Sequence, residues 1–308
     1  MLTSRITPES LRHYIQKVEL PARSAEIGPG LAETIIRKGS FVGSVIEHRT
    51  SMGRTMDHAR SHIDQFERTG KSVSSGTAFL ADRLHRSKGR FVRQWHAPEG
   101  GLWGSMIYVS TLLPATRLLL PLAVGISCCE SLRQSGAERA EIRWINDVLI
   151  DGKKVAGILL EGFYGSFSKE EYNLVGFGIN VNNSDFPAEI RDLAVSLRDF
   201  LGRSVELETF TYCFLAKLTW NLGLLCHGED CFLGDGGWPH MRHNHPLIDR
   251  WCELSSSVGR RVLFGFDVVN NPQYQATVTG ISDTGGLQLR LDDGSEIVEH
   301  SGEIRYLR

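Results

Sequence analysis

The dipeptide Asp151-Gly152 constrains the fold of this chain more than any other sequence feature. It separates two apolar segments with alternating patterns, "AEIRWINDVLI" before it and "KKVAGILLEGFYG" after it. Asp-Gly favours a two-residue turn in which both residues have positive φ, and such a turn joins antiparallel strands. The sequence therefore predicts a β-hairpin over residues 140–165 and a sheet in the middle of the chain.

Lys154 stands at the start of the second predicted strand. Because side chains alternate between the two faces of a strand, four residues are predicted to share one face: Lys154, Ala156, Ile158 and Leu160. An ammonium on an apolar face needs an anion, and the neighbouring Gly157 leaves room for a ligand. Two interpretations stay open: Lys154 binds a carboxylate or phosphate, or it is a turn lysine whose ammonium reaches water.

Helical and strand patterns along the rest of the chain predict an α+β fold. Residues 1–40 are predicted to form a short helical extension, in which Thr7 caps a helix that begins at Pro8. Residues 41–250 mix strands and helices, and residues 251–308 hold short strands with glycine-rich turns. The main predicted elements are strands at "SFVGSVIEH", "SGTAFLADRL", "GLWGSMIYVSTLL" and "EYNLVGFGINVNN", helices at "TMDHARSHIDQFERTG", 118–136, 188–202 and 206–227, and a small C-terminal β-barrel.

Composition excludes several classes of protein. Lys and Arg total 34 against 36 Asp and Glu, so a protein that coats nucleic acid or an anionic membrane through its overall charge is not expected. The most apolar run, "TLLPATRLLLPLAVGISCCESL", is interrupted by Pro114, Arg117 and Pro121, which predicts a buried helix rather than a membrane span. Six cysteines outside any disulfide framework predict a cytoplasmic protein with reduced thiols.

The segment "KGRFVRQWHAPEGGLWGS" at 88–105 combines basic residues, glycines and two tryptophans. Lys88, Arg90 and Arg93 place three donors on a bendable segment that suits an anionic nucleotide or an acyl phosphate. Trp95 and Trp103 are expected to anchor its end in the core. The alternative is a solvated basic loop, which is what most charge runs are.

The motif "RWIND" at 143–147 places Asn146 and Asp147 at the start of a strand. Side-chain oxygens of this kind can help to hold hydrated Mg²⁺, which prefers one or two protein ligands together with substrate phosphates. The alternative is turn chemistry, because Asn and Asp commonly cap loops.

These pieces together resemble the biotin protein ligase family. Its Gly-Arg-Gly-Arg-x-Gly-Arg-x-Trp loop and the following Ser-Pro-x-Gly-Gly-Leu-Tyr-x-Ser are similar to "SKGRFVRQWHAPEGGLWGS", Lys-Trp-Pro-Asn-Asp to "RWIND", and Arg-Lys-x-Ala-Gly-Ile-Leu-x-Glu to "KKVAGILLE". "GFGINVNN" resembles the Gly-x-Gly-Ile-Asn strand, and "VGRRVLFGF" to "SGEIRYLR" resembles the SH3-like C-terminal domain. The resemblance covers about residues 41–308 and implies a mixed-sheet catalytic core at 41–250 followed by an SH3-like domain at 251–308.

The resemblance implies an acyl-adenylate-forming ligase that uses ATP, Mg²⁺ and biotin and modifies a lysine of a biotin carboxyl carrier domain of a carboxylase. It implies catalytic roles for Lys154, Arg90 and Asp147, with Asp147 reaching Mg²⁺ through phosphates, and allows a homodimer that pairs through its sheets. The implied ATP and adenylate contacts are Arg90, Arg93, Trp95, Asn146, Lys154 and Asn180. The implied acid-binding residues are Arg54, Thr55, Leu84, Lys88, Gly89, Gly157 and Ile158.

The sequence departs from the family pattern where biotin should bind. Arg54-Thr55-Met56-Asp57 replaces a Ser-Thr-Asn-like motif, with arginine in place of the serine that contacts the ureido group, and Leu84 replaces a glutamine. In the basic loop, the positions of the family's first arginine and of its first and third glycines hold Lys88, Ser87 and Val92. Either biotin is bound differently, or the substrate is another acid, such as one with a negative group that faces Arg54.

Three further hypotheses stay open. A ligase of the same superfamily could activate lipoate, octanoate or another acid, and a non-catalytic protein could bind a small acid or an adenylate. The third is a zinc site, because "CHGEDC" and "PHMRHNH" place suitable ligands within twenty residues. Its candidate ligands are Cys226, Cys231, His240 and His243, near His227 and His245; the alternative is an irregular insertion.

Overall fold

The turn at Asp151-Gly152 forms as predicted in the computed structural model of this chain, which describes residues 6–90, 93–234 and 245–307. Asp151 and Gly152 have φ angles of 51° and 78°, the positive values that a two-residue hairpin turn requires. They join β5 (Asp147–Ile150) to β6 (Lys153–Tyr164) in an antiparallel pair. The hairpin prediction is confirmed.

The segment 140–150, predicted as one strand, forms two. β4 (Ala140–Arg143) runs antiparallel to β5, and residues 144–146 turn between them. The single-strand prediction is wrong because Trp144 leaves the sheet at this turn. Its ring is 1% exposed, and its Nε1 donates to the carbonyl of Gly285, 3.1 Å away.

Within the described residues, seven strands form one mixed sheet in the order β1-β2-β3-β7-β6-β5-β4. β1 and β2 are parallel, and the other neighbouring strands are antiparallel. The strands not yet described are β1 (Ile46–Met52), β2 (Ala78–Leu84), β3 (Leu102–Val109) and β7 (Glu171–Ile179). Strand β1 starts later than predicted, because the chain bends over residues 41–45, where Gly43 has a φ of 67°.

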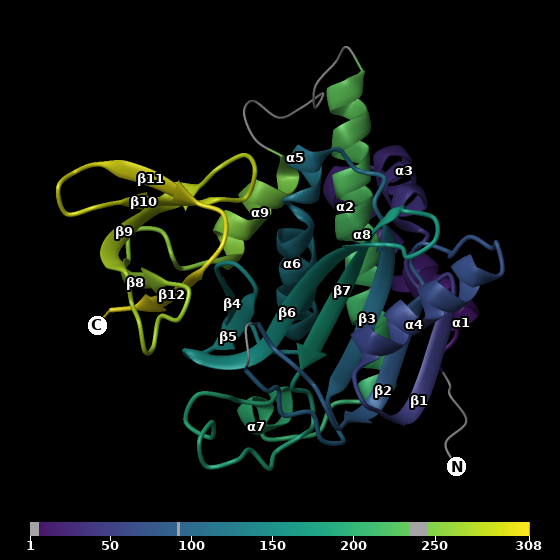
Figure 1. The fold of residues 1–308 in the computed structure, drawn as a ribbon, viewed down its shortest axis with the longest axis horizontal. Helices are drawn as coiled ribbons and strands as arrows, with labels where there is room; N and C mark the ends of the chain where they lie inside the picture. The colour runs from purple at the N-terminus through teal and green to yellow at the C-terminus, as the bar shows by residue number, and fades with distance from the viewer. Residues whose placement is uncertain (1–5, 91–92, 235–244, 308) are drawn as a thin grey trace.

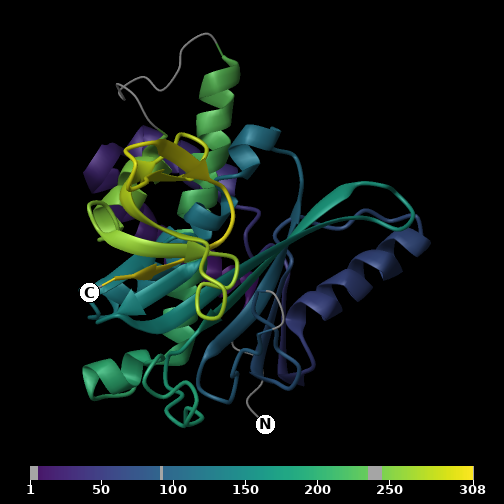
Figure 2. The ribbon, with the colours of Figure 1, turned by 60° about the vertical axis from the view of Figure 1, so that its left-hand side comes forward.

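Helices cover both faces of this sheet, with α4 (Thr55–Arg68) on one side and α8 (Leu207–Leu233) on the other (Figures 1 and 2). On the α4 side, Met56 and Ile63 join a core that includes Phe79 and Tyr172. α8 packs beside α6 (Leu120–Gln134), which confirms the predicted buried helix.

The segment Pro114–Gln134, which holds α5 (Pro114–Arg117) and α6, is long and apolar enough by composition to cross a membrane. However, 72% of its most apolar window is buried inside the protein, where α6 packs against α8 and the sheet. That burial is typical of a core helix. The helix predicted at 188–202 is wrong over most of its length: turns occupy 188–193, and α7 (Leu197–Leu201) is short.

Residues 8–39 form helices, as predicted for the N-terminal extension: α1 (Pro8–Tyr14), the π-helical η1 (Ile15–Glu19), α2 (Leu20–Ile27) and α3 (Pro29–Gly39). The Thr7 side chain accepts a hydrogen bond from the N–H of Ser10 and so caps α1. α1 and α3 pack against α8. These helices are therefore part of the layer that covers the sheet.

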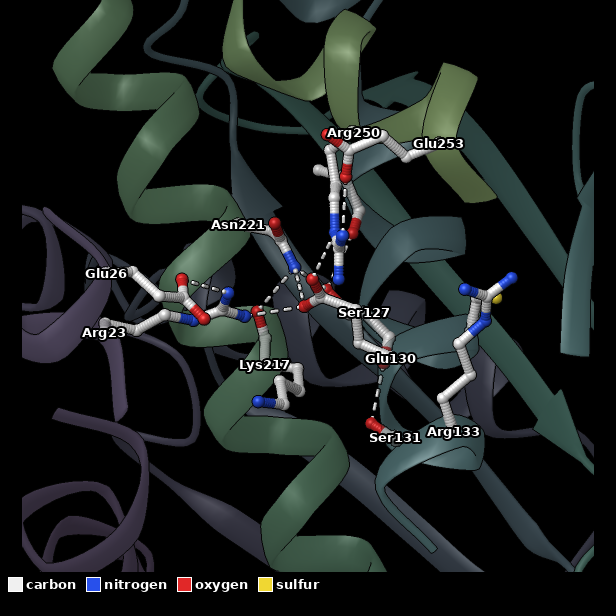
Figure 3. A network of polar contacts seen from close by, with 12 residues as sticks. Arg23, Glu26, Ser127, Glu130, Ser131, Arg133, Lys217, Asn221, Arg250 and Glu253 are labelled. Atoms are coloured by element: carbon white, nitrogen blue, oxygen red, sulfur yellow. Dashed lines mark hydrogen bonds and ion pairs between the residues drawn. The ribbon is translucent and has the colours of Figure 1, made fainter. Parts of the chain in front are cut away.

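A network of buried ions ties this helical extension to the core (Figure 3). Arg23 of α2 lies 2.8 Å from the Glu19 carboxylate and 2.7 Å from the Glu130 carboxylate of α6. Lys217 of α8 also pairs with Glu19, and Arg250 pairs with Glu130. Arg250 belongs to α9 (Pro246–Leu254), so the network joins five helical elements: η1, α2, α6, α8 and α9.

After α9, the described residues form a five-stranded antiparallel sheet in the order β11-β10-β9-β8-β12. Its strands are β8 (Arg261–Gly265), β9 (Tyr274–Ile281), β10 (Leu287–Arg290), β11 (Glu296–Glu299) and β12 (Glu303–Tyr306). This small sheet lies beside β4 and β5 (Figure 1), where the ring of Trp144 packs 6.5 Å from that of Phe264. The α+β fold class is confirmed.

Candidate active site

A cavity of about 400 Å³ lies where β6 and β7, the basic loop, the start of α4 and the small C-terminal sheet meet. Its lining includes every site residue predicted from the sequence apart from the cysteine and histidine cluster: Arg54, Thr55, Leu84, Lys88, Gly89, Arg90, Arg93, Trp95, Asn146, Asp147, Lys154, Gly157, Ile158 and Asn180. Residues more than 120 positions apart in the sequence therefore meet at one place.

Lys154 reaches this cavity because strand β6 is bulged. The register of β6 against β5 shifts between Val148 and Leu149, and the bulge reverses the alternation of side chains beside Lys154. A Cβ atom on Gly157 would lie 3.0 Å from Cε and 3.2 Å from Nζ of Lys154. Lys154 thus shares the face of Gly157, and the predicted face shared with the buried Ala156 is wrong.

The anion that Lys154 requires is supplied by Asp147. Lys154 Nζ lies 2.5 Å from Asp147 Oδ1, and Arg143 Nη2 lies 2.6 Å from Oδ2 of the same carboxylate. Burial raises the pKa of a carboxyl group, but the two cations outweigh burial and lower the pKa of Asp147 to about 2. An ammonium has three N–H donors, so Lys154 can hold Asp147 and still bind a substrate oxygen.

A glycine in β7 leaves the strand backbone without a side chain at the cavity, and the ring of Trp95 packs on it. Trp95 lies over Gly178 of β7, where a Cβ atom would come within 2.7 Å of the indole nitrogen. The same ring lies 5.2 Å from Nζ of Lys154, within the range of a cation–π interaction. Trp103, fully buried, packs edge-on against Trp95 at 6.4 Å. Trp103 therefore anchors the end of the basic loop in the protein interior, as expected, whereas Trp95 is half-buried and lines the cavity.

The basic loop contacts the C-terminal sheet through its arginines. Arg90 donates from Nη1 to the carbonyl of Gly302 at 2.7 Å and to Asn146 Oδ1 at 3.2 Å. Arg93 pairs with Glu303 at 2.7 Å and with Asp267 at 3.5 Å. Burial lowers the pKa of Arg90. Both arginines of the loop are therefore bound to acceptors within the protein.

Arg54, Thr55, Met56 and Leu84 also line the cavity. Arg54 precedes α4, and its guanidinium pairs with Glu161 of β6 and, at 3.1 Å, with Asp57. Burial lowers the pKa of an arginine, but these carboxylates outweigh it and raise the pKa of Arg54. Lys154 and Arg54 therefore both line the cavity, and each is paired with carboxylates of the protein.

Sequence reasoning missed three charged residues that shape this site: Arg143, Glu161 and Glu303. These residues belong to the motifs "RWIND", "KKVAGILLE" and "SGEIRYLR", in which other residues drew attention. Their presence in motifs that resemble the family was the sequence signal that could have identified them as site residues. The segment 186–194 was also missed; it lines the cavity, and the N–H of Lys154 donates to the carbonyl of Leu193 at 2.7 Å.

Two of the four predicted zinc ligands lie within the described residues. Cys226 and Cys231 lie in the last turns of α8, outside the cavity, and Cys231 Sγ is 3.6 Å from His227 Nε2. His240 and His243 lie outside the described residues. Among residues 6–90, 93–234 and 245–307, no group of three or more His, Cys, Asp or Glu side chains could hold a metal ion.

Magnesium does not fit Asp147 as a direct ligand. Both carboxylate oxygens of Asp147 are engaged, by Lys154 and by Arg143. The amide of Asn146 is engaged as well, since it accepts from Arg90 and donates to the carbonyl of Ile158. Neither side chain presents an unengaged oxygen.

Comparison with known proteins assigns this fold and cavity to a class. Residues 66–180 match the sequence model of the Biotin/lipoate A/B protein ligase family, and residues 258–305 match that of the Biotin protein ligase C terminal domain. The first range holds most of the cavity residues, and the second holds the small sheet.

Individual relatives narrow the class. The chain is 34% identical over 238 residues to the "Bifunctional ligase/repressor BirA" of Salmonella typhimurium, covering 75% of this chain and 69% of that protein. It is 32% identical over 232 residues to the Bacillus subtilis protein of the same name, covering 74% of this chain and 66% of that one. The chain thus spans about two thirds of the length of these relatives.

A solved structure agrees over most of the fold. The biotin protein ligase from Aquifex aeolicus in complex with biotin and ATP has a TM-score of 0.64 at 25% identity, covering 86% of this chain and 99% of that one. The chain belongs to the biotin protein ligase family.

Proposed function

We propose that this protein is an ATP-dependent biotin protein ligase. In the first step, a carboxylate oxygen of biotin attacks the α-phosphorus of ATP, and the bond to the leaving pyrophosphate breaks. In the second, a lysine amine of a carrier domain attacks the acyl carbon, and AMP leaves. The observation that carries the proposal is the placement of Lys154, Arg90 and Arg93 around one cavity with Asp147.

Lys154 would act between the two substrates. Its ammonium reaches the cavity over Gly157, and it would offset the negative charge that builds up where a carboxylate meets an α-phosphate. Asp147 orients this ammonium, and Arg143 keeps the Asp147 carboxylate paired while Lys154 binds substrate. Positioning and electrostatic stabilisation are most of what a phosphorus centre requires.

Arg90 and Arg93 would close the basic loop over the adenylate. Arg93 is about half exposed, so its ion pair with Glu303 is worth no more than about 1 kcal/mol. Phosphate oxygens can therefore compete with the C-terminal sheet for Arg93. A closed loop also excludes water from a mixed anhydride that would otherwise hydrolyse.

We assign Mg²⁺ to the phosphate oxygens of ATP rather than to Asp147, whose oxygens are engaged. We also propose a biotin carboxyl carrier domain as acceptor, supported by a relative from Paracoccus denitrificans, named "Biotin--[acetyl-CoA-carboxylase] ligase", that is 27% identical over 231 residues. A cytoplasmic location and a homodimer complete the proposal. The six free cysteine thiols support the proposed cytoplasmic location.

The test is release of pyrophosphate from ATP with biotin, followed by transfer to a carrier domain. The unmodified chain is expected to turn over, and Lys154→Ala to lose at least about 100-fold in kcat. Lys153→Ala is the matched control, because the neighbouring Lys153 is exposed and does not line the cavity. Equal loss in both variants would contradict the role of Lys154.

Arg54 and Leu84 favour one second candidate, a ligase of the same reaction type for a different acid. Turnover with lipoic or octanoic acid but not with biotin would establish it. Absence of pyrophosphate release with any acid would instead favour a non-catalytic protein that binds a small acid or an adenylate.

A further inference from the structure

A second cavity, of about 360 Å³, lies apart from the active site and among the N-terminal helices. Its lining comes from α1, η1, the start of α2 and α3, together with Gly43 and Ser44 before β1 and Thr219 of α8. None of these residues lines the cavity that holds Lys154. The volume falls in the range of about 300–1,000 Å³ that small-molecule sites occupy.

One wall of this N-terminal cavity depends on the π-helical turn η1. The N–H of Leu20 donates to the carbonyl of Ile15, five positions earlier. In a π-helical turn residues five apart lie on nearly the same side, whereas five residues make about 1.4 turns of an α-helix. Ile15 and Leu20 therefore both line the cavity. Single π-helical turns within longer helices are rare and are frequent at functional sites.

The buried ion network holds this turn in place. Glu19, the last residue of η1, does not line the cavity; it is 1% exposed and pairs with Arg23 and Lys217. A buried carboxylate that left these cations would be uncompensated, which is costly. The wall that η1 contributes is therefore fixed before any ligand binds.

The interior of the N-terminal cavity is apolar. Leu11, Ile15, Ile36 and Val42 line it, and each is at most 7% exposed. An apolar group that leaves water to pack against these side chains gains free energy in proportion to the area buried. The cavity therefore suits a ligand with an apolar body.

The hydroxyl groups of the lining already donate within the protein. Ser40, Ser44 and Thr219 each donate to a backbone carbonyl, at 2.7, 3.1 and 2.9 Å. Recognition of a polar group on the ligand therefore falls mainly to the charged side chains of the lining, since an arginine has five N–H donors and no acceptor.

The charged residues of the lining leave one positive charge over. They are Arg12, Arg37 and Glu33, and all three are exposed. Within the described residues no carboxylate pairs with Arg12 or Arg37, in contrast to the buried Arg23, which has three. A ligand with a single negative charge would balance this site, and a guanidinium matches the geometry of a carboxylate.

We propose that the N-terminal cavity binds a linear monocarboxylate with an apolar tail, of the medium-chain fatty acid class. Arg12 and Arg37 hold the carboxylate, and the tail packs against Leu11, Ile15 and Ile36. This inference goes beyond the proposed ligase function and does not rest on it, because the two cavities share no residue.

The first test measures the Kd of the full chain for hexanoate, octanoate and decanoate by titration calorimetry, below the concentrations at which these acids form micelles. The affinity is expected to rise about fourfold for each methylene that the cavity buries. 1-Decanol, which has the tail without the charge, is expected to bind at least about tenfold more weakly than decanoate. Absence of binding, an affinity independent of chain length, or equal affinity for acid and alcohol would overturn the proposal.

The second test removes each arginine in turn. Arg12→Gln and Arg37→Gln are each expected to weaken decanoate binding about tenfold and to leave 1-decanol binding unchanged. Lys17→Gln is the matched control, because Lys17 is an exposed cation of η1 that does not line the cavity. Its Kd for decanoate is expected to change less than about twofold. Equal weakening in all three variants would indicate only general attraction to a basic surface and would contradict the site. The chain-length and alcohol measurements need no variant, so they decide the matter even if a variant does not fold.

A third measurement separates this cavity from the active site, which also accepts acids in the proposed function. Lys154→Ala is expected to bind decanoate with an unchanged Kd, since Lys154 lines only the active-site cavity. A large loss of affinity in Lys154→Ala would assign decanoate to the active site and end the proposal. Failure of pyrophosphate release with biotin would refute the ligase function alone, because none of these binding measurements depends on turnover.

Discussion

Two neighbouring cations keep Asp147 ionised. Its carboxylate lies between Lys154 and Arg143, and breaking a buried pair is costly because it leaves a charge uncompensated. Because Asp147 has two cationic partners, the loss of one of them costs less free energy. When Lys154 turns toward a bound carboxylate, Arg143 still compensates Asp147, so the lysine can change partners during a reaction.

Asp147→Asn is therefore expected to destabilise the protein in a way that depends on pH. The pKa of Asp147 falls from 3.8 to about 2 on folding, which corresponds to about 2 kcal/mol of stability. Because the folded-state pKa is the lower one, this stability is present above about pH 4 and is lost as the pH falls toward 2. Urea unfolding of both proteins from pH 7 to pH 2 measures it.

The free energies of unfolding of the two proteins should differ at pH 7 and converge at low pH. A gap that stays constant across this range would show that the carboxylate charge does not provide the stability. Lys153→Ala, an exposed change on the same hairpin, controls for general effects of substitution in this strand.

At the scale of elements, the N-terminal helices are joined to the core by charge as well as by apolar packing. Arg23 is 6% exposed and bridges Glu19 of η1 and Glu130 of α6, while its guanidinium also lies 4.9 Å from the Trp220 ring centroid. The cations offset the desolvation of both glutamates and lower the pKa of Glu130. Residues 8–39 therefore depend on α6 and α8 for their position (Figure 3).

Arg23→Met is expected to cost about 3–5 kcal/mol, because it leaves buried glutamates with fewer partners. The matched control is Glu26→Gln, which removes another partner of the same arginine. Glu26 is 57% exposed, so its loss should cost less than about 1 kcal/mol. Urea unfolding monitored by tryptophan fluorescence measures both variants, and similar costs would argue against a buried network.

At the scale of the whole molecule, two sheets meet at one buried tryptophan. Trp144 projects from the β4–β5 turn, packs near Phe264 and donates to the Gly285 carbonyl. The basic loop bridges the same two parts through Arg90 and Arg93. The small sheet therefore contributes to the wall of the cavity and is coupled to the catalytic sheet.

We expect the unmodified protein to unfold in one calorimetric transition and Trp144→Ala to unfold in two. Removing a fully buried tryptophan costs about 3–5 kcal/mol, and here the loss falls on the contact between the two sheets. A single, unshifted transition in Trp144→Ala would show that this contact does not couple the two parts.

Several features followed from the sequence because they depend on neighbouring residues. The Asp151-Gly152 turn, the Thr7 cap and the amphipathic helix at 55–68 are local, since each is decided within a few positions of the chain. The ordered motifs also identified the residues around the cavity, because they lie in short segments with distinctive composition. The sequence could not show the ion pair between Arg54 and Glu161, because these residues are 107 positions apart and meet only in the folded chain.

Other features were decided only by tertiary structure. The bulge that turns Lys154 toward the cavity depends on pairing with β5 and on the segment near Leu193, and alternation along β6 alone predicted the opposite face. Arg90 finds its carbonyl acceptor 212 positions away, at Gly302. By itself the sequence determined the local turns, caps and motifs; the folded chain decided which face and which partner each charge received, because desolvation and ion pairing depend on residues that meet only after folding.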